Sequence, residues 1–196
     1  MIAIVNYGAG NLNSVKKAFD YLGAEVMVTN RPETVSAADK IVFPGVGHFS
    51  SLQALDEAGW REALLLSSSA GKPFLGICLG MQWLFEGSEE CIEIIGAGIF
   101  PGKCRLFPSS VKSPHVGWNS LTIREGSRLL RGIAANSFVY YTHSFHAPMV
   151  SETTAASEYG LQFTAVVERR NIFGVQFHPE KSGDVGLTIL KNFCEV

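Results

Sequence analysis

The sequence predicts an α/β fold, in which an open, mostly parallel sheet carries helices on both faces and an antiparallel extension in its second half. Two observations predict it. In the first half, short runs rich in β-branched residues alternate with amphipathic segments of helical period. After Gly98 the pattern changes to extended segments separated by turns. The 196 residues, 46% of them hydrophobic, suit a single domain spanning 1–196.

The first half supplies the parallel strands and their helices in alternation. Residues 2–5 form a short apolar strand. The segment over about 12–22 is expected to be a helix because its apolar residues recur three or four positions apart, and Gly23 follows at the C-cap position. Further expected elements are strands near 25–28, 40–43 and 74–77, a turn at 30–32, and helical patterns over roughly 50–66.

The second half is expected to add antiparallel strands to the same domain. Residues 111–123, 138–150 and 163–177 read as extended segments, and a turn over 168–171 interrupts the last of them. A helix is expected over about 184–194. No segment has the composition of a linker, so the change of pattern indicates an extension of one domain and not a second one.

Charge and cysteine content exclude several classes of protein. The formal net charge is −2 and the basic residues are scattered, which argues against nucleic acid or a membrane surface as a partner. No basic leader precedes the first strand, and no apolar stretch approaches the roughly 20 residues of a membrane span. We expect no structural zinc, no disulfide framework and a cytoplasmic setting, because no C-x-x-C spacing occurs among Cys78, Cys91, Cys104 and Cys194.

A candidate nucleophile lies where a predicted strand meets a helical pattern. Residues 76–82 read Gly-Ile-Cys-Leu-Gly-Met-Gln, so Cys78 has a glycine two positions away on each side. A nucleophile on a sharp strand-to-helix turn needs such glycines, because neighbouring Cβ atoms would collide with the adjoining backbone. The N–H groups and dipole of the following helix favour the thiolate, which is the reactive form. Taken alone, the motif also fits an ordinary buried cysteine in a glycine-rich turn.

Among the five histidines, His178 has the sequence context of a catalytic base. Residues 174–180 read Gly-Val-Gln-Phe-His-Pro-Glu, so an apolar strand ends in a histidine and Glu180 follows two residues later. In an extended chain this spacing puts both side chains on one side, where the carboxylate can orient the imidazole and stabilise the imidazolium. The alternative is a strand-end histidine with an incidental surface glutamate. The strand-to-helix turn at Cys78, a nucleophile elbow, disfavours this alternative.

Donors for an oxyanion are expected at the end of another parallel strand. Residues 43–47 read Phe-Pro-Gly-Val-Gly, and such small residues can turn backbone N–H groups towards a substrate. The amide of Leu79, just after the nucleophile, would be a second donor. The alternative is a Pro-Gly turn without chemical meaning. We favour the oxyanion site because ligands of open α/β sheets bind at the carboxyl ends of strands, where Gly45 and Cys78 both fall.

At these residues the sequence resembles the class I, triad-type glutamine amidotransferases, which implies a flavodoxin-like fold. The Gly-x-Cys-x-Gly elbow and the His-Pro-Glu segment are both intact. The resemblance covers essentially the whole chain and is most specific to the glutaminase subunits of imidazole glycerol phosphate synthase, from histidine biosynthesis. The blocks that occur in the order found in those subunits are residues 6–11, 44–47, 76–82, 115–119, 140–145 and 178–182.

The resemblance implies that L-glutamine is hydrolysed through a γ-glutamyl thioester. Cys78 would attack the side-chain amide, His178 would transfer protons and Glu180 would orient His178. Gln82, one helical turn after Cys78, would bind the substrate, although a polar helix residue without a ligand is the alternative. The implied oxyanion and substrate contacts are Gly45, Val46, Gly47, Leu79, Gln82, His143, Ser144 and Phe145.

The resemblance also implies a partner, because an isolated glutaminase would release ammonia that is mostly protonated near neutral pH. The expected partner is a (β/α)8 cyclase subunit in a heterodimer, with low glutaminase activity in its absence and the strand at 44–47 as the switch. Burial in the core is the alternative for Tyr140, and core positions are expected for Trp60 and Trp83. The residues expected to lie towards the partner are Asn11, Trp118, Tyr140 and Lys181.

No motif for a cofactor or a synthase of its own can be recognised in the chain. It has no phosphate-binding glycine-rich loop and no ATP-site motif, so we expect no cofactor and no metal. Three alternatives stay open. They are the glutaminase subunit of another synthase, such as that of pyridoxal phosphate, a γ-glutamyl peptidase, and a non-catalytic binding relative. Retention of Cys78, His178 and Glu180 together counts against the last.

Overall fold

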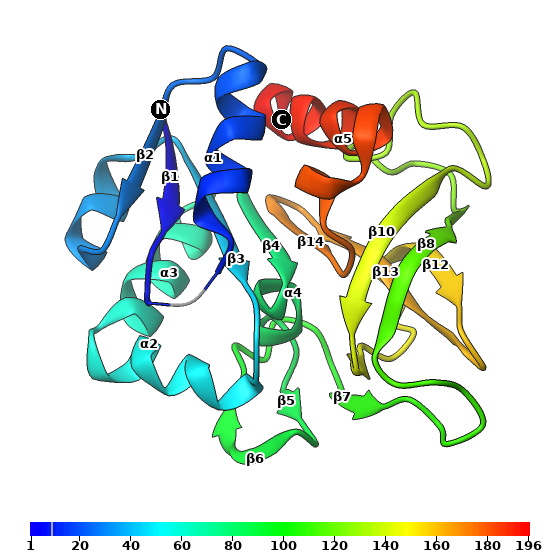
Figure 1. The fold of residues 1–196 in the computed structure, drawn as a ribbon. Coiled ribbons are helices and arrows are strands. Elements are labelled where there is room, and N and C mark those ends of the chain that lie inside the picture. The colour runs from blue at the N-terminus through cyan, green and yellow to red at the C-terminus, as the bar shows by residue number, and fades with distance from the viewer. Residues whose placement is uncertain (9) are drawn as a thin grey trace.

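The central sheet follows the predicted α/β plan. The computed structural model describes residues 1–8 and 10–196. Within them, an eight-stranded sheet has the order β2-β1-β3-β4-β14-β13-β12-β9 (Figure 1). The strands from β2 to β14 in this order run parallel, and β13, β12 and β9 continue the sheet antiparallel. The parallel strands are β1 (Ile2–Val5), β2 (Val26–Thr29), β3 (Lys40–Gly45), β4 (Phe74–Cys78) and β14 (Ile172–Val175).

Helices cover both faces of the parallel strands. Side chains of α1 and α5 join the apolar core on one face, and those of α2, α3 and α4 join the core on the other (Figure 1). None of the helices within residues 1–8 and 10–196 is long and apolar enough to cross a membrane. The helices are α1 (Leu12–Tyr21), α2 (Gln53–Glu57), α3 (Trp60–Ser69), α4 (Leu79–Trp83) and α5 (Gly183–Glu195), with 3-10 turns at Pro32–Ala37, Phe49–Leu52 and Pro179–Lys181.

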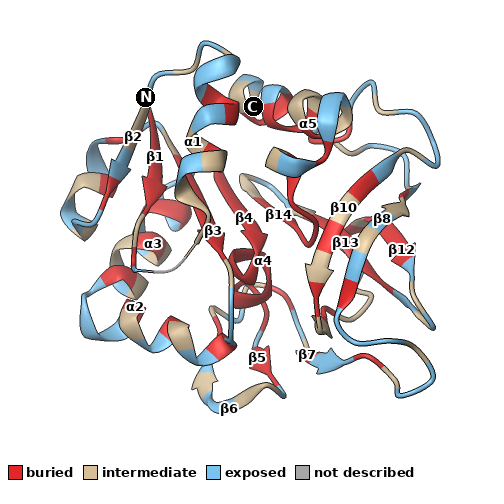
Figure 2. Cartoon of the chain, in the orientation of Figure 1, coloured by how far each residue is buried: buried red, intermediate tan, exposed pale blue. Residues whose placement is uncertain are grey.

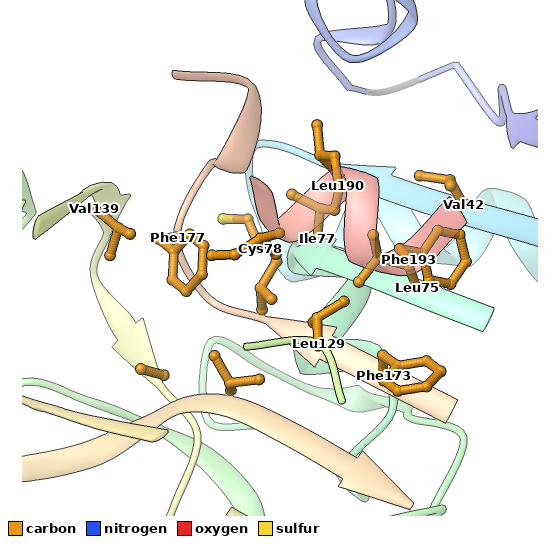
Figure 3. Packing of buried hydrophobic residues seen from close by; sticks show 14 of the residues in the cluster. Val42, Leu75, Ile77, Cys78, Leu129, Val139, Phe173, Phe177, Leu190 and Phe193 are labelled. Atoms are coloured by element: carbon orange, nitrogen blue, oxygen red, sulfur yellow. The ribbon is translucent and has the colours of Figure 1, made fainter. Parts of the chain in front are cut away.

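Two apolar cores form because alternate residues of a strand point to opposite faces of the sheet. In β3, Val42 enters the core under α1 and α5, whereas Ile41 enters the other. Figure 2 shows the central strands buried along their length, with exposed residues on the outer faces of the helices. In Figure 3, side chains of α5 lie over those of β3 and β4. Trp60 and Trp83 are both buried, which confirms the core positions expected for them.

The second half forms two smaller sheets beside the main one. β8 pairs with β10, and a four-stranded sheet has the order β11-β7-β5-β6. β5, β6, β7 and β12 were not expected from the sequence, because they are short or, like β12, rich in Ala and Ser and held mainly by pairing. These elements are β5 (Gly87–Ser88), β6 (Cys91–Ile95), β7 (Lys103–Leu106), β8 (His115–Ser120), β9 (Thr122–Ile123), β10 (Phe138–His143), β11 (Phe145–His146), β12 (Thr153–Glu158) and β13 (Gln162–Arg169).

Several expected elements have different limits. The extended segment over 111–123 begins only at His115, and that over 138–150 ends at His146. The helical pattern over 50–66 is divided at Gly59, whose φ of 74° lies in the left-handed region and ends α2 before α3 begins. The extended segment over 163–177 is a hairpin of β13 and β14 that turns at Arg170, as expected. However, β14 ends at Val175, so His178 lies beyond the strand and not at its last residue.

Candidate active site

Cys78 occupies the turn between β4 and α4. Its φ is 54° and its ψ is −107°, a conformation that costs a residue with a side chain about 1–3 kcal/mol. The turn places the side chain at the carboxyl end of β4 and at the first turn of a helix, as expected for a nucleophile elbow. In register, Cys78 lies opposite Gly45 of β3.

The two glycines of the elbow are required by close backbone packing. A side chain at Gly76 would place its Cβ 2.5 Å from the carbonyl oxygen of Gly80. A side chain at Gly80 would place its Cβ 1.9 Å from the carbonyl oxygen of Phe43. Neither backbone group can move without disturbing β3 or α4, so the Gly-x-Cys-x-Gly spacing follows from the geometry of the turn.

His178 and Glu180 form a buried pair. Nδ1 of His178 lies 2.9 Å from Oε1 of Glu180, and the exposed fractions of the two side chains are 2% and 1%. The spacing predicted two side chains on one side of an extended strand, and this prediction is wrong. Pro179 instead begins a 3-10 turn, which brings the carboxylate back under the imidazole.

Backbone hydrogen bonds from β10 hold His178 in place beyond the end of β14. The N–H of His178 donates to the carbonyl oxygen of Tyr140 at 2.9 Å. The hydroxyl of Ser182 donates to the carbonyl oxygen of His178 at 2.6 Å and accepts from the N–H of Tyr140 at 3.0 Å. The position of the imidazole therefore depends on a strand far away in the sequence.

The electrostatic surroundings of His178 favour its protonated form. Burial lowers the pKa of His178, but the Cys78 thiol and the Glu180 carboxylate raise it by more, so the net direction is upward. Nε2 of His178 has no hydrogen bond of normal geometry within the described residues, although Cys78 is close enough to affect the imidazole. The raised pKa makes the His178 imidazole a better proton acceptor than an ordinary histidine.

Cys78 and His178 both line one cavity of about 320 Å³. It contains most of the predicted site residues. Three residues that we did not predict, Glu90, Pro114 and Thr142, also line it. The predicted residues in its wall are Val46, Gly47, Cys78, Leu79, Gln82, His143, Ser144, Phe145 and His178.

Two predicted residues lie behind the cavity wall. Glu180 contacts His178 and is not part of the lining. Gly45 is likewise absent from the lining, and a Cβ there would lie 2.7 Å from the hydroxyl of Tyr7 and 2.8 Å from the Cβ of Leu79. Gly45 thus lets β3 approach α4 closely, and the residues after it reach the cavity.

Glu90 is the acidic residue of the cavity wall that sequence reasoning missed. It follows β5, and its Oε2 accepts a hydrogen bond from the N–H of Phe49 at 2.7 Å. In the sequence, Glu89 and Glu90 look like an ordinary exposed pair. Only the pairing of β5 with β6 and β7 brings Glu90 to the cavity.

An aromatic and basic cluster lies on the surface formed by β8 and β10. Trp118 is 55% exposed, and its ring centroid lies 6.0 Å from that of Tyr140. Nζ of Lys181 lies 5.8 Å from the centroid of Tyr140. Tyr140 is therefore at the surface, while its neighbour Tyr141 is fully buried, because successive residues of a strand face opposite ways.

Asn11 immediately precedes α1, which packs against the turn at Pro179–Lys181. Residue 9, within the motif at 6–11, lies outside the described residues. Within residues 1–8 and 10–196, no group of three or more His, Cys, Asp or Glu side chains is arranged to hold a metal ion.

The fold and site define a class of amidotransferase. Residues 3–196 match the family model described as "Glutamine amidotransferase class-I". The solved structure of PurLQS from Thermotoga maritima is similar, with a TM-score of 0.78 and 18% identity, covering 99% of this chain and 97% of that chain. At this identity the likeness concerns the fold alone.

Relatives with higher identity indicate the branch. The imidazole glycerol phosphate synthase subunit HisH of Methanothermobacter thermautotrophicus is 47% identical, over 100% of this chain and 98% of that relative. The HisH subunit of Bacillus cereus is 46% identical, over 98% of this chain and 93% of that relative. The chain therefore belongs to the class-I glutamine amidotransferases and, within them, to the HisH subunits of imidazole glycerol phosphate synthase.

Proposed function

We propose that this chain is the glutaminase subunit of an imidazole glycerol phosphate synthase and passes ammonia to a cyclase subunit. One observation carries the proposal. The cavity at the carboxyl ends of β3 and β4 holds a thiol on a strained turn together with a buried imidazole and carboxylate pair. Membership in the HisH subunits supports the same function and favours it over the glutaminase of another synthase or a γ-glutamyl peptidase.

The reaction begins when the Cys78 thiol gives its proton to Nε2 of His178. The sulfur attacks the side-chain amide carbon of glutamine, and the new C–S bond leaves negative charge on the amide oxygen. His178 returns the proton to the amide nitrogen, the C–N bond breaks and ammonia leaves. Water then gives a proton to His178 and attacks the thioester carbon. The C–S bond breaks, glutamate leaves and the sulfur regains its proton from His178.

Backbone N–H groups on two sides of Cys78 can donate hydrogen bonds to the negative amide oxygen. Leu79 is the first residue of α4, so its N–H is free of intrahelical partners and lies next to the sulfur. Val46 and Gly47 line the same cavity from the end of β3. The φ of Gly47 is 98°, which glycine adopts without strain, so this peptide can rotate at low cost. Such a rotation would let a partner control whether these N–H groups point at the amide oxygen.

Polar groups in the cavity wall suit the α-amino and carboxylate groups of glutamine. Gln82 uses its amide nitrogen for the carbonyl oxygen of Phe145 at 2.8 Å, which leaves its oxygen to accept from the substrate ammonium. Glu90 adds a carboxylate to the same wall and is a second partner for that ammonium. His143 and Ser144 line the same cavity.

The surface of β8 and β10 suits the cyclase subunit, a (β/α)8 protein. Val116, Trp118 and Phe138 are each more than half exposed on it, at 56%, 55% and 57%. A contiguous apolar and aromatic surface of this kind is typical of protein interfaces. Tyr140 and Lys181 continue it, and we include Asn11 in the interface as well.

We also propose that residues 1–196 act as one domain.

Substitution of the nucleophile tests the function. In the complex with the cyclase subunit and its nucleotide substrate, Cys78→Ala is expected to lower glutamate production at least about 1,000-fold. The same complex should still form imidazole glycerol phosphate from added ammonium salt. The control Cys91→Ala changes a half-buried thiol outside the cavity and should keep full activity. Glutamine-dependent synthesis by the Cys78→Ala complex would contradict the proposal.

Coupling to the partner is tested with the unaltered chain. Its glutaminase rate is expected to rise when the cyclase subunit and nucleotide are added together. An equal rate for the isolated chain would show that no switch operates at residues 46–47.

A further inference from the structure

A line of buried hydrogen bonds joins the cavity wall to Cys78. Nε2 of Gln82 donates to the carbonyl oxygen of Phe145 at 2.8 Å and to Oε1 of Gln176 at 3.1 Å. Nε2 of Gln176 in turn donates to Sγ of Cys78 at 3.7 Å. Gln82 and Gln176 are 4% and 0% exposed, so neither amide can exchange these partners for bulk water.

The backbone carbonyl of Phe145 determines how both amides point. A carbonyl oxygen only accepts, so the group of Gln82 that faces it must be the NH₂ group. The same NH₂ group faces Gln176, so the Gln176 atom there must be its oxygen. The NH₂ group of Gln176 is therefore the one that lies beside Cys78. The network places a donor, and not an acceptor, against the sulfur.

Two buried histidines bind the same Phe145 carbonyl and help to hold it in place. Nδ1 of His143 donates to the carbonyl oxygen of Phe145 at 2.9 Å, and Nε2 of His143 accepts from Nδ1 of His115 at 3.2 Å. Nε2 of His115 accepts from Nδ2 of Asn119 at 3.4 Å. The Asn119 amide is oriented separately, since its oxygen accepts from the N–H of Ser120. The carbonyl of Phe145 at one end and the NH₂ group of Asn119 at the other therefore require the same neutral tautomers of the two imidazoles.

Gln176 contacts the nucleophile but not the space that the substrate fills. Gln82 belongs to the described cavity lining, whereas Gln176 does not. Gln176 lies one residue after β14, in the segment that leads to His178. Figure 3 shows Phe177 of this segment next to Cys78. The segment thus brings both a proton acceptor and a hydrogen-bond donor to one sulfur.

We propose that Gln176 is a further catalytic residue, whose NH₂ group stabilises negative charge on Sγ of Cys78. The proposal rests on the proposed role of Cys78 as the nucleophile. The sulfur is anionic just before it attacks the amide and again when the thioester breaks. A hydrogen bond to an ion is roughly twice as strong as one between neutral groups, so Gln176 favours the thiolate over the thiol. Gln82 couples this donor to the substrate pocket.

Two variants test the donor in the full chain. Gln176→Met removes the NH₂ group at similar length, and Gln176→Glu keeps the shape while removing the fixed donor. Alkylation of Cys78 by iodoacetamide, located by peptide mass, is measured as a function of pH. We expect alkylation about 10-fold slower at pH 7 in Gln176→Met, with the rate recovered at higher pH, and a larger loss in Gln176→Glu.

Kinetics of the complex with the cyclase subunit separate this role from substrate binding. Because Gln176 is outside the cavity lining, kcat for glutamine is expected to fall about 10-fold while KM stays within about twofold. Asn192→Leu is the matched control. Asn192 is a buried amide that donates to the carbonyl oxygens of Leu129 and Arg131, so its loss lowers stability without changing the pH dependence of Cys78 alkylation.

Two results would overturn the proposal. One is an unchanged pH dependence of Cys78 alkylation in both Gln176 variants, and the other is a rise in KM without a fall in kcat. If both variants fail to fold, the contact between Gln176 and Cys78 is tested by NMR on the unaltered chain. The side-chain amide signals of Gln176 should shift when Cys78 is alkylated, and unshifted signals would exclude the contact. Failure of the proposed function is separate, since it would appear as glutaminase activity in Cys78→Ala.

Discussion

The two walls of the cavity are held in different ways. The wall from the first half, at residues 46–47 and 78–79, lies at the carboxyl ends of the neighbouring strands β3 and β4. Its shape depends on glycines that allow backbones to touch. The wall from the second half, at residues 142–145 and 178, is held by buried hydrogen bonds between distant segments. The first wall is therefore sensitive to added volume, and the second to changes in charge and hydrogen bonding.

The largest expected effect is on chemistry in the second wall. Glu180→Gln keeps the shape of the side chain but removes the charge that stabilises protonated His178. We expect kcat for glutamine in the complex to fall about 1,000-fold, because the imidazolium formed in the first step loses its counter-ion. The free energy of unfolding should change much less than activity. A Glu180→Gln complex with near-normal kcat would show that the pair only positions the ring.

The next effect is on stability in the first wall. Gly80→Ala would place a methyl group 1.9 Å from the carbonyl oxygen of Phe43, so β3 or α4 must move. We expect a loss of about 3 kcal/mol in the free energy of unfolding, measured by urea denaturation.

Gly126→Ala is the control for that loss. Gly126 has a φ of 90° but open space around it, so an alanine there meets only backbone strain and should cost about 1 kcal/mol. Equal losses at the two glycines would mean that backbone contact at the elbow does not cause the loss of stability in Gly80→Ala.

The smallest effect is a pH dependence that arises in the second wall. Burial lowers the pKa of His143 to about 3, while the unfolded chain keeps the ordinary value near 6.5. Between these values the unfolded chain binds a proton that the folded chain does not, so stability falls as pH falls from about 6.5. The slope for one such histidine is about 1.4 kcal/mol per pH unit.

Thermal unfolding between pH 7 and pH 4.5 measures this slope. His143→Gln is expected to reduce the slope without abolishing it, because burial also lowers the pKa of His115 and of His146. The exposed His48→Gln should leave the slope unchanged. His178 does not contribute in this range, because its raised pKa gives a stabilisation that is complete below about 6.5 and is lost only at higher pH. A slope that is the same in His143→Gln and the unaltered chain would exclude His143 as the source.

Local motifs were enough to predict the first wall. The elbow glycines, the strand ends and the helix that follows Cys78 are encoded within about ten neighbouring residues, and the structure has them at the expected positions. The second wall was predicted only in part. His143, Ser144 and Phe145 line the cavity as the resemblance implied, but Glu90 carries no local signal and Gln176 looks like a buried strand residue.

The sequence by itself determined the α/β plan and the Cys78 elbow, because strand period, helix period and glycine sterics act over short stretches of chain. Tertiary structure alone decided three features. It placed Glu90 in the cavity, returned Glu180 to His178 through a 3-10 turn, and aimed the NH₂ group of Gln176 at Sγ of Cys78. Each of these depends on hydrogen bonds or strand pairing between distant segments, whose partners no local pattern specifies.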